Sequence, residues 1–183
     1  LPFEWSVHKW ETIDKEIDDG KSFLKFTDQD IERQFVETLL EAVGDNGTIF
    51  AHNAKWVEIR ILNLLKNKDS CMDLANKIDK IIDRVEDSLI LSRMNFYSPK
   101  MNGEWKIKSI IKAIPDCPVS YDGQDNIGGG DEAQLAWFIY TDVKTKDDKK
   151  KEQIKNLLDY CAKDTLALYY LIKFLMNKSN EQS

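Results

Sequence analysis

The sequence predicts a single α/β domain with a mixed central sheet flanked by helices and a long C-terminal helix. Near the N-terminus, residues 1–10 alternate apolar and polar residues with the period of two that is typical of a strand, and residues 22–26 form a short aromatic and apolar segment. Further along, short apolar runs end in polar junctions and lead into stretches of helical spacing, which is the arrangement of an α/β layer. The 183 residues suffice for one hydrophobic core, so we expect residues 1–177 to form one domain, followed by a disordered tail at 178–183.

Charge and cysteine content exclude several classes of protein. With 26 basic and 32 acidic residues, the chain has no overall basic field, so any contact with nucleic acid is local. No apolar run reaches the roughly 18 residues that a membrane span needs. The three cysteines form no C-x-x-C pair, and neither a disulfide framework nor a zinc site fits them. We therefore expect a cytoplasmic protein with reduced thiols.

The N-terminal half is expected to alternate strands and helices. Residues 1–10 and 22–26 are predicted as a hairpin around a turn at Asp18-Asp19-Gly20. A helix then runs from a cap at 27–30 to Gly44, and residues 48–51 form a buried strand that ends at His52-Asn53. Further helices are predicted at 54–66 and from about 72. Residues 88–92 fit a strand or a helix.

The C-terminal half is expected to be mostly helical. A loop at 97–103 precedes a helix at 107–113, which ends before Pro115. Residues 116–131 form the longest irregular segment, and the glycines at 128–130 lack the context of a phosphate-binding loop. A helix at 132–141, a solvated linker along the charge run 144–151 and a long helix at 151–177 follow.

One border of the last helix combines a tyrosine with a carboxylate. At about 100° per residue, Tyr160, Asp164 and Ala167 lie along the edge of the apolar stripe, whereas Asp159 falls on the opposite face. We therefore expect Asp164 to be half-buried. This pattern fits a metal-facing helix of a nuclease, but the residues alone favour a Tyr–Asp pair that closes the edge of the core.

Five ordered segments carry a resemblance to a known family. They are Pro2-Phe3-Glu4-Trp5-Ser6-Val7-His8, His52-Asn53-Ala54-Lys55-Trp56, Tyr97-Ser98-Pro99-Lys100-Met101-Asn102-Gly103, Ile107-Lys108 and Tyr160-Cys161-Ala162-Lys163-Asp164-Thr165-Leu166-Ala167. The chain resembles a bacterial domain-of-unknown-function family that is similar to the DnaQ-like 3′–5′ exonucleases of the ribonuclease H-like superfold. The resemblance covers nearly the whole chain and implies a ribonuclease H-like mixed sheet.

The resemblance also implies a metal site. Such exonucleases hold two divalent ions with four carboxylates, because two ions stabilise the attacking water and the leaving oxygen of a phosphodiester. By this likeness, Asp164 is a metal ligand and Tyr160 orients the water. The first motif, Asp-x-Glu, is expected upstream of Pro2, so we expect the sheet in this chain to lack its first strand and further domains to precede it. Another carboxylate is expected at the position of Val57.

Further candidate residues lie around this motif. Glu58 follows Val57 directly, but successive side chains on a helix point about 100° apart. Glu58 can therefore replace the missing carboxylate only if the helix start is shifted by one residue. Asp87 matches another acidic position of the family, with helix capping as the alternative. His52, Asn53 and Lys108 are candidate contacts to nucleic acid; the alternatives are a capping role for His52, a bond to the loop backbone for Asn53 and an exposed surface lysine for Lys108.

Two functional hypotheses follow from the sequence. The first is metal-dependent 3′–5′ hydrolysis of DNA or RNA phosphodiesters by a domain whose site is incomplete or degenerate, with Mg²⁺ or Mn²⁺ bound weakly. The second is a catalytically inactive module that binds nucleic acid or another protein, and Val57 favours it. Single-stranded DNA or RNA is the expected partner of the site, no membrane contact is expected, and whether the chain is an enzyme stays open.

Overall fold

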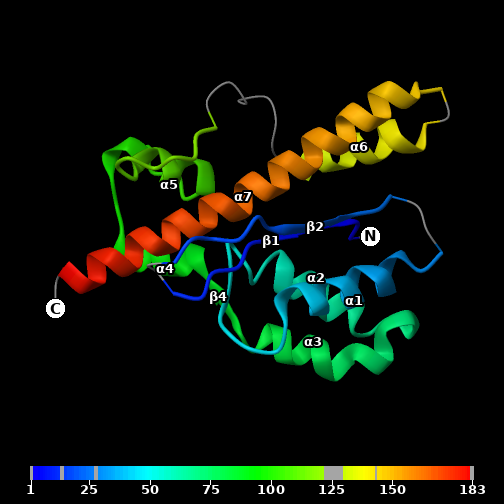
Figure 1. Ribbon diagram of the computed structural model, residues 1–183, viewed down its shortest axis with the longest axis horizontal. Coiled ribbons are helices and arrows are strands. Elements are labelled where there is room, and N and C mark those ends of the chain that lie inside the picture. Colours follow the sequence, from blue (N-terminus) through cyan, green and yellow to red (C-terminus); the bar gives the residue numbers. More distant parts are fainter. Residues whose placement is uncertain (1, 13–14, 27–28, 122–129, 143, 182–183) are drawn as a thin grey trace.

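A long C-terminal helix organises the molecule. The computed structural model describes residues 2–12, 15–26, 29–121, 130–142 and 144–181. Helix α7 (Asp147–Glu181) crosses the whole molecule, and the N-terminal strand pair and the later helices pack along it (Figure 1). Of the glycine run predicted to be irregular, positions 128 and 129 lie outside the described residues, and Gly130 begins a helix.

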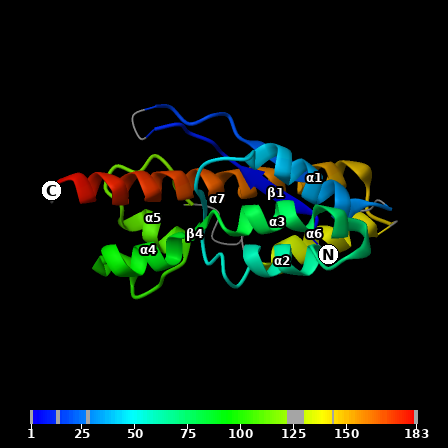
Figure 2. The ribbon, with the colours of Figure 1, turned by 90° about the horizontal axis from the view of Figure 1, so that it is seen from below.

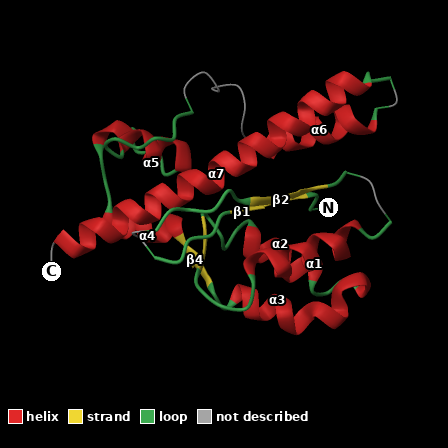
Figure 3. Cartoon of the chain, in the orientation of Figure 1, coloured by secondary structure: helices red, strands yellow, loops and turns green. Residues whose placement is uncertain are grey.

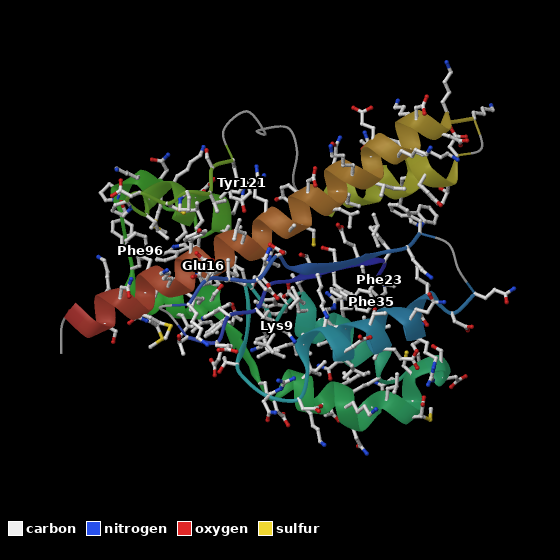
Figure 4. All side chains as sticks on the ribbon, viewed as in Figure 1. Lys9, Glu16, Phe23, Phe35, Phe96 and Tyr121 are labelled. Carbon is white, nitrogen blue, oxygen red and sulfur yellow. The ribbon has the colours of Figure 1, made fainter. Side chains whose placement is uncertain are left out.

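The N-terminal strands form the predicted hairpin. β1 (Glu4–Val7) and β2 (Lys21–Leu24) pair antiparallel, with Trp5 opposite Phe23. Their rings stack with centroids 6.1 Å apart, and Phe23 meets Phe35 of α1 (Ile31–Val43) edge-on at 5.9 Å (Figure 4). The apolar face of the hairpin is therefore packed on α1, which ends at Gly44 as predicted.

A second, parallel pair of strands follows. β3 (Ile49–Ala51) pairs with β4 (Val85–Asp87), and the crossover between them consists of α2 (Glu58–Leu65), η1 (Asp69–Leu74) and α3 (Ala75–Ile82). Within the described ranges the two strand pairs do not join (Figure 3). The α/β class and the mixture of pairings are confirmed, whereas the single central sheet is present only as two small sheets.

Three predictions for the N-terminal half need correction or resolution. The helix expected from 54 begins at Glu58, because Asn53 adopts a left-handed φ of 63° and the chain makes a turn there. The helix expected from 72 is α3, which begins at Ala75 after the 3₁₀ turn η1. The segment that fits either a strand or a helix is helical, as α4 (Ser88–Asn95).

The C-terminal helices match the predictions more closely. The predicted loop contains the short 3₁₀ helix η2 (Pro99–Met101), α5 (Ile107–Ala113) has the expected bounds, and α6 is Gly130–Thr141. α7 begins at Asp147, so half of the charge run predicted as a linker is helical, and α7 continues through 178–181, where a tail was expected. Asp147 and Asp148 favour this early start, because carboxylates stabilise the N-terminal turn of a helix.

The hydrophobic core consists of two clusters. One holds the hairpin against α1, α2 and α3, and the other holds η2 and α5 against α7. The two groups of helices lie at different positions along the axis of α7 (Figure 2), and Figure 1 shows α5 on the opposite side of α7 from α1, α2 and α3. Trp10, which follows β1, stacks on Phe50 of β3 at 6.0 Å and meets Tyr169 of α7 edge-on at 5.1 Å, so it joins the two strand pairs to the long helix.

Across the ranges that the structure describes, no helix combines the length and apolar character needed to cross a membrane.

Candidate acidic site

The polar face of β1 lies against α7. Ser6 Oγ is 3.2 Å and His8 Nδ1 is 2.7 Å from Thr165 Oγ1. Two residues cover about 7 Å along a strand, and four residues cover about 6 Å along a helix. Glu4 lies two residues before Ser6, and Cys161 lies four residues before Thr165. Glu4 is therefore level with Cys161. The carboxyl of Glu4 is hydrogen-bonded with the Cys161 thiol. Both faces of this strand are therefore covered.

Glu4 carries an unusual carboxyl group. Its Oε1 is shielded from solvent and has no hydrogen-bond partner among the described residues. Burial raises the pKa of Glu4 to about 8, the bond with Cys161 opposes this rise in part, and the nearby carboxylate of Asp164 adds to it by repulsion. Glu4 is consequently protonated for the most part at neutral pH.

Asp164 is held by tyrosines. The Tyr121 hydroxyl donates to Asp164 Oδ1 at 2.6 Å, and Tyr160, one helical turn before Asp164, makes a second hydrogen bond to its carboxylate. Burial raises the pKa of Asp164, while the hydrogen bonds from the two tyrosines and then the positive charge of Lys108 lower it in part. Asp164 is half-buried, as predicted, and Tyr121 lies beside α7 (Figure 4).

These side chains come from three elements that are distant in the sequence: β1, the segment after α5, and α7. We call the set the Glu4–Asp164 centre, and it comprises Glu4, Tyr121, Tyr160, Cys161 and Asp164.

Two lysines flank the centre. Lys108 Nζ lies 5.1 Å from the ring centre of Tyr160 and 5.4 Å from that of Tyr121, and Lys163 Nζ lies 5.7 Å from the latter. Lys163 also donates to the Ser120 carbonyl at 3.3 Å. Ammonium groups at these distances from ring faces form cation–π contacts. The lysines therefore give this edge of the centre local positive charge in an acidic chain.

His52 has contacts of a structural kind. Its Nδ1 lies 2.9 Å from Ser88 Oγ, and its Nε2 lies 2.8 Å from the carbonyl oxygen of Trp105. Because a carbonyl only accepts, we assign the proton to Nε2 and let Nδ1 accept from the serine. Burial lowers the pKa of His52, so the ring is neutral. Both ring nitrogens are thus engaged within the protein.

Asp87 joins two polypeptide segments. Its Oδ1 accepts from the backbone N–H groups of Asn53 and Leu89, each at 2.9 Å, and Oδ2 accepts from Lys55 N–H at 3.4 Å. The bond to Leu89 caps α4, which is the capping alternative from the sequence. Asp87 fixes the turn at Asn53, and its charge acts on His52 at the edge of the centre.

Glu58 is the first residue of α2, and Val57 is the residue before that helix. The helix start is therefore shifted relative to the prediction. Glu58 is exposed at the surface. Neighbouring protein atoms desolvate its carboxyl in part and, together with the charge of Asp87, raise its pKa. Glu58 in turn raises the pKa of the Cys161 thiol, so its charge is felt at the centre.

Two site residues escaped the sequence analysis. Glu4 stands at a polar position of an alternating strand, and that position indicates a solvent-facing side chain. Tyr121 follows a helix within an irregular segment and has no motif around it. The sequence does contain one indication of Glu4, because Glu4, Ser6 and His8 lie on the same face of the strand. Three polar residues on one strand face can form a buried polar layer when they lie opposite a helix that has a polar border of its own.

The comparison with known families bears on the first part of the chain. Residues 1–106 match the family described as Domain of unknown function (DUF2779), which is more than half of the chain. The chain belongs to this family. β1 to α4 lie within the matched residues of the DUF2779 family, whereas Lys108, Tyr121, Tyr160 and Asp164 lie beyond them. No curated protein and no solved structure matches the sequence. The likeness to DnaQ-like exonucleases stays a prediction.

Proposed function

We propose that the chain is a DnaQ-like domain that binds a divalent cation and a phosphodiester of single-stranded nucleic acid at the Glu4–Asp164 centre and hydrolyses that phosphodiester slowly. The observation that supports this most is the buried, unpartnered Oε1 of Glu4 beside the carboxylate of Asp164. A bound cation stabilises two neighbouring carboxylates, because its positive charge favours the ionised forms that burial and mutual repulsion disfavour.

The donor set fits a weakly held ion. In the part of the chain that the structure describes, no three His, Cys, Asp or Glu side chains are grouped so as to hold a metal. Mg²⁺, however, is commonly bound through one or two carboxylates together with waters and substrate phosphates. Glu4 and Asp164 are the residues that would hold it. When bound, Mg²⁺ or Mn²⁺ supplies positive charge to the phosphate oxygens and favours deprotonation of a water.

The remaining residues of the centre have separate parts in this proposal. Tyr160 is bonded to Asp164 and orients the attacking water with its hydroxyl. Lys108, beside both tyrosine rings, attracts the phosphodiester by charge, and Lys163, which also lies close to the ring of Tyr121, does the same. Glu58, at the start of α2, is the candidate third carboxylate, because its charge is felt at Cys161.

A ribonuclease H-like sheet is part of the same proposal. β1 and β3 each have one edge without a strand partner among the described residues, and the contact between Trp10 and Phe50 holds their neighbourhoods together. One strand inserted between these edges would join the antiparallel and parallel pairs. The result is the mixed sheet that the resemblance implies, with the inserted strand as its first strand.

Cleavage of a labelled single strand tests the proposal. A 5′-labelled oligonucleotide is incubated with the protein and Mn²⁺, and the products are separated by length. We expect slow, Mn²⁺-dependent shortening from the 3′ end that Asp164→Asn abolishes. Asp159→Asn is the matched control, because Asp159 is an exposed carboxylate on the same helix. Cleavage that persists undiminished in Asp164→Asn contradicts the proposal.

A specific observation favours the second hypothesis, a catalytically inactive nucleic-acid-binding module. The Tyr121 hydroxyl donates a hydrogen bond to Asp164 Oδ1, so this oxygen already has a partner. Val57 lies at the position where the resemblance implies a carboxylate. Such a module binds single strands with an affinity that falls as salt rises, and it forms no product at any Mn²⁺ concentration. Binding without turnover, measured on the same oligonucleotide, therefore separates the two functions.

A further inference from the structure

The helical hairpin of α6 and the start of α7 exposes large apolar side chains. The two helices lie side by side at the end of α7 away from the C-terminus (Figures 1 and 2). Ala136 is buried between them, whereas Leu135 is 56%, Trp137 36% and Phe138 62% exposed. The rings of Trp137 and Phe138 meet edge-on with centroids 5.3 Å apart. The hairpin therefore presents a pair of aromatic rings to its surroundings.

The connection between the two helices and the start of α7 carry a small excess of lysines. Between residues 142 and 155 there are six lysines and four acidic residues, in a chain whose net charge is −6. Lys150 Nζ lies 5.7 Å from the ring centre of Tyr140, and that ring stacks on Phe26 at 4.6 Å. Aromatic and basic side chains are thus interleaved on this hairpin, and Tyr140 anchors it to the chain that follows β2.

We propose that the α6–α7 hairpin binds single-stranded nucleic acid and leads its end toward the Glu4–Asp164 centre. Exposed aromatic rings stack on unpaired bases of any sequence, and lysines neutralise the adjoining phosphates. α7 is one continuous helix, on which Lys150 and Asp164 are separated by about 21 Å along the axis. The binding rests on the hairpin alone, whereas the direction toward Asp164 rests on the function proposed above.

The arrangement suits a single strand better than a membrane surface. A helix that lies on a bilayer needs one continuous apolar stripe with basic residues along the opposite face. Trp137 and Phe138 are consecutive, so their side chains diverge by about 100° around α6. The apolar side chains of α6 therefore do not form the single continuous stripe that a bilayer surface needs.

Fluorescence anisotropy with labelled oligothymidylates tests the inference. The probes are about 5 and about 20 nucleotides long, which brackets the usual site sizes of single-strand binders. The double variant Trp137→Ala, Phe138→Ala is compared with Leu64→Ala, an exposed apolar residue of α2. We expect the double variant to lose at least about 5-fold in affinity for the longer probe, because each stacked base contributes strongly to binding. The control variant binds as the wild type does.

Salt dependence tests the lysines separately. Replacing Lys149, Lys150 and Lys151 by Gln is expected to reduce the slope of log K against log salt by about 2, since three phosphate contacts are removed. Circular dichroism of each variant checks that the helices are retained. Wild-type binding by the hairpin variants overturns the inference, as does an absence of binding by the wild type. Binding to phosphatidylserine vesicles in place of oligothymidylate also overturns it and identifies a membrane surface instead.

The outcomes separate this inference from the proposed function. If the hairpin variants lose the oligonucleotide and the wild type neither binds Mn²⁺ nor cleaves, the hairpin stands as a binding surface and the proposed function fails. If Asp164→Asn abolishes cleavage while the hairpin variants bind and cleave normally, the proposed function stands and the hairpin inference fails.

Discussion

Replacing Glu4 by Gln should make the protein more stable at alkaline pH. The pKa of Glu4 is raised from 4.5 to about 8 in the folded chain, chiefly by burial. Between those two pH values the folded state holds a proton that the unfolded state has released, so the stability contributed by the neutral acid is full below pH 4.5 and is lost as the pH rises toward 8. Gln cannot ionise, and its contribution stays constant across this window.

The size of the effect follows from the width of the window. Each pKa unit corresponds to about 1.4 kcal/mol, so a rise from 4.5 to about 8 sets an upper limit of about 5 kcal/mol. Glu4 is half-buried, so partial solvation reduces the free-energy cost of ionising its carboxyl. We therefore expect Glu4→Gln to be more stable than the wild type by about 2–4 kcal/mol at pH 8.5. At pH 5 the variant should lie within about 1 kcal/mol of the wild type, since only the bond with Cys161 is altered.

Urea unfolding followed by tryptophan fluorescence measures this difference. The free energy of unfolding is determined for the wild type, Glu4→Gln and the control Glu86→Gln at pH 5, 6.5 and 8.5. Glu86 is an exposed carboxylate on β4, so its replacement should leave the curve of stability against pH parallel to that of the wild type. Parallel curves for Glu4→Gln would refute the reasoning, because the carboxyl would then titrate normally in the folded chain.

Three further predictions concern the surroundings of the centre and the core. Tyr121→Phe should tighten Mn²⁺ binding by releasing Asp164 Oδ1, at a cost of about 1 kcal/mol in stability; unchanged or weaker binding by calorimetry would count against it. Leu171→Ala, at a fully buried position of α7, should lower the stability measured by urea unfolding by about 3 kcal/mol, and a loss below 1 would be inconsistent with this packing. Arg33→Ala, which breaks a two-point bond with Asp73 at 2.8 and 2.9 Å, should lower the stability measured by urea unfolding slightly, and less at high salt; a salt-independent loss would argue against the ion pair.

Local patterns made most elements predictable. The hairpin follows from the alternation in residues 1–10, the short apolar run at 22–26 and the turn between them, and α1 ends at Gly44 because its φ of 67° suits glycine. The helix that carries Asp164 was expected from its apolar stripe, and the half-buried position of Asp164 follows from the same geometry. These features depend on residues that are close together in the sequence, so the spacing of apolar and polar residues is enough to predict them.

Features that depend on distant contacts could not be predicted in this way. The turn that delays α2 to Glu58 is held by bonds from Asp87 to the backbone at Asn53, and those residues are far apart in the sequence. The unusual carboxyl of Glu4 depends on α7 covering the polar face of β1. Tyr121 reaches Asp164 across 43 positions. In each case the decisive partner belongs to another element, which periodicity does not identify.

Titration of the chain with Mn²⁺ by calorimetry tests the central claim most directly. The measurement uses the wild type, Asp164→Asn, Glu4→Gln and the control Asp159→Asn at pH 7.5. We predict weak binding by the wild type, accompanied by proton release because Glu4 must ionise, and the same binding by the control. Both Asp164→Asn and Glu4→Gln should abolish it. Absence of binding by the wild type, or equal binding by Asp164→Asn, would contradict a cation site at the Glu4–Asp164 centre.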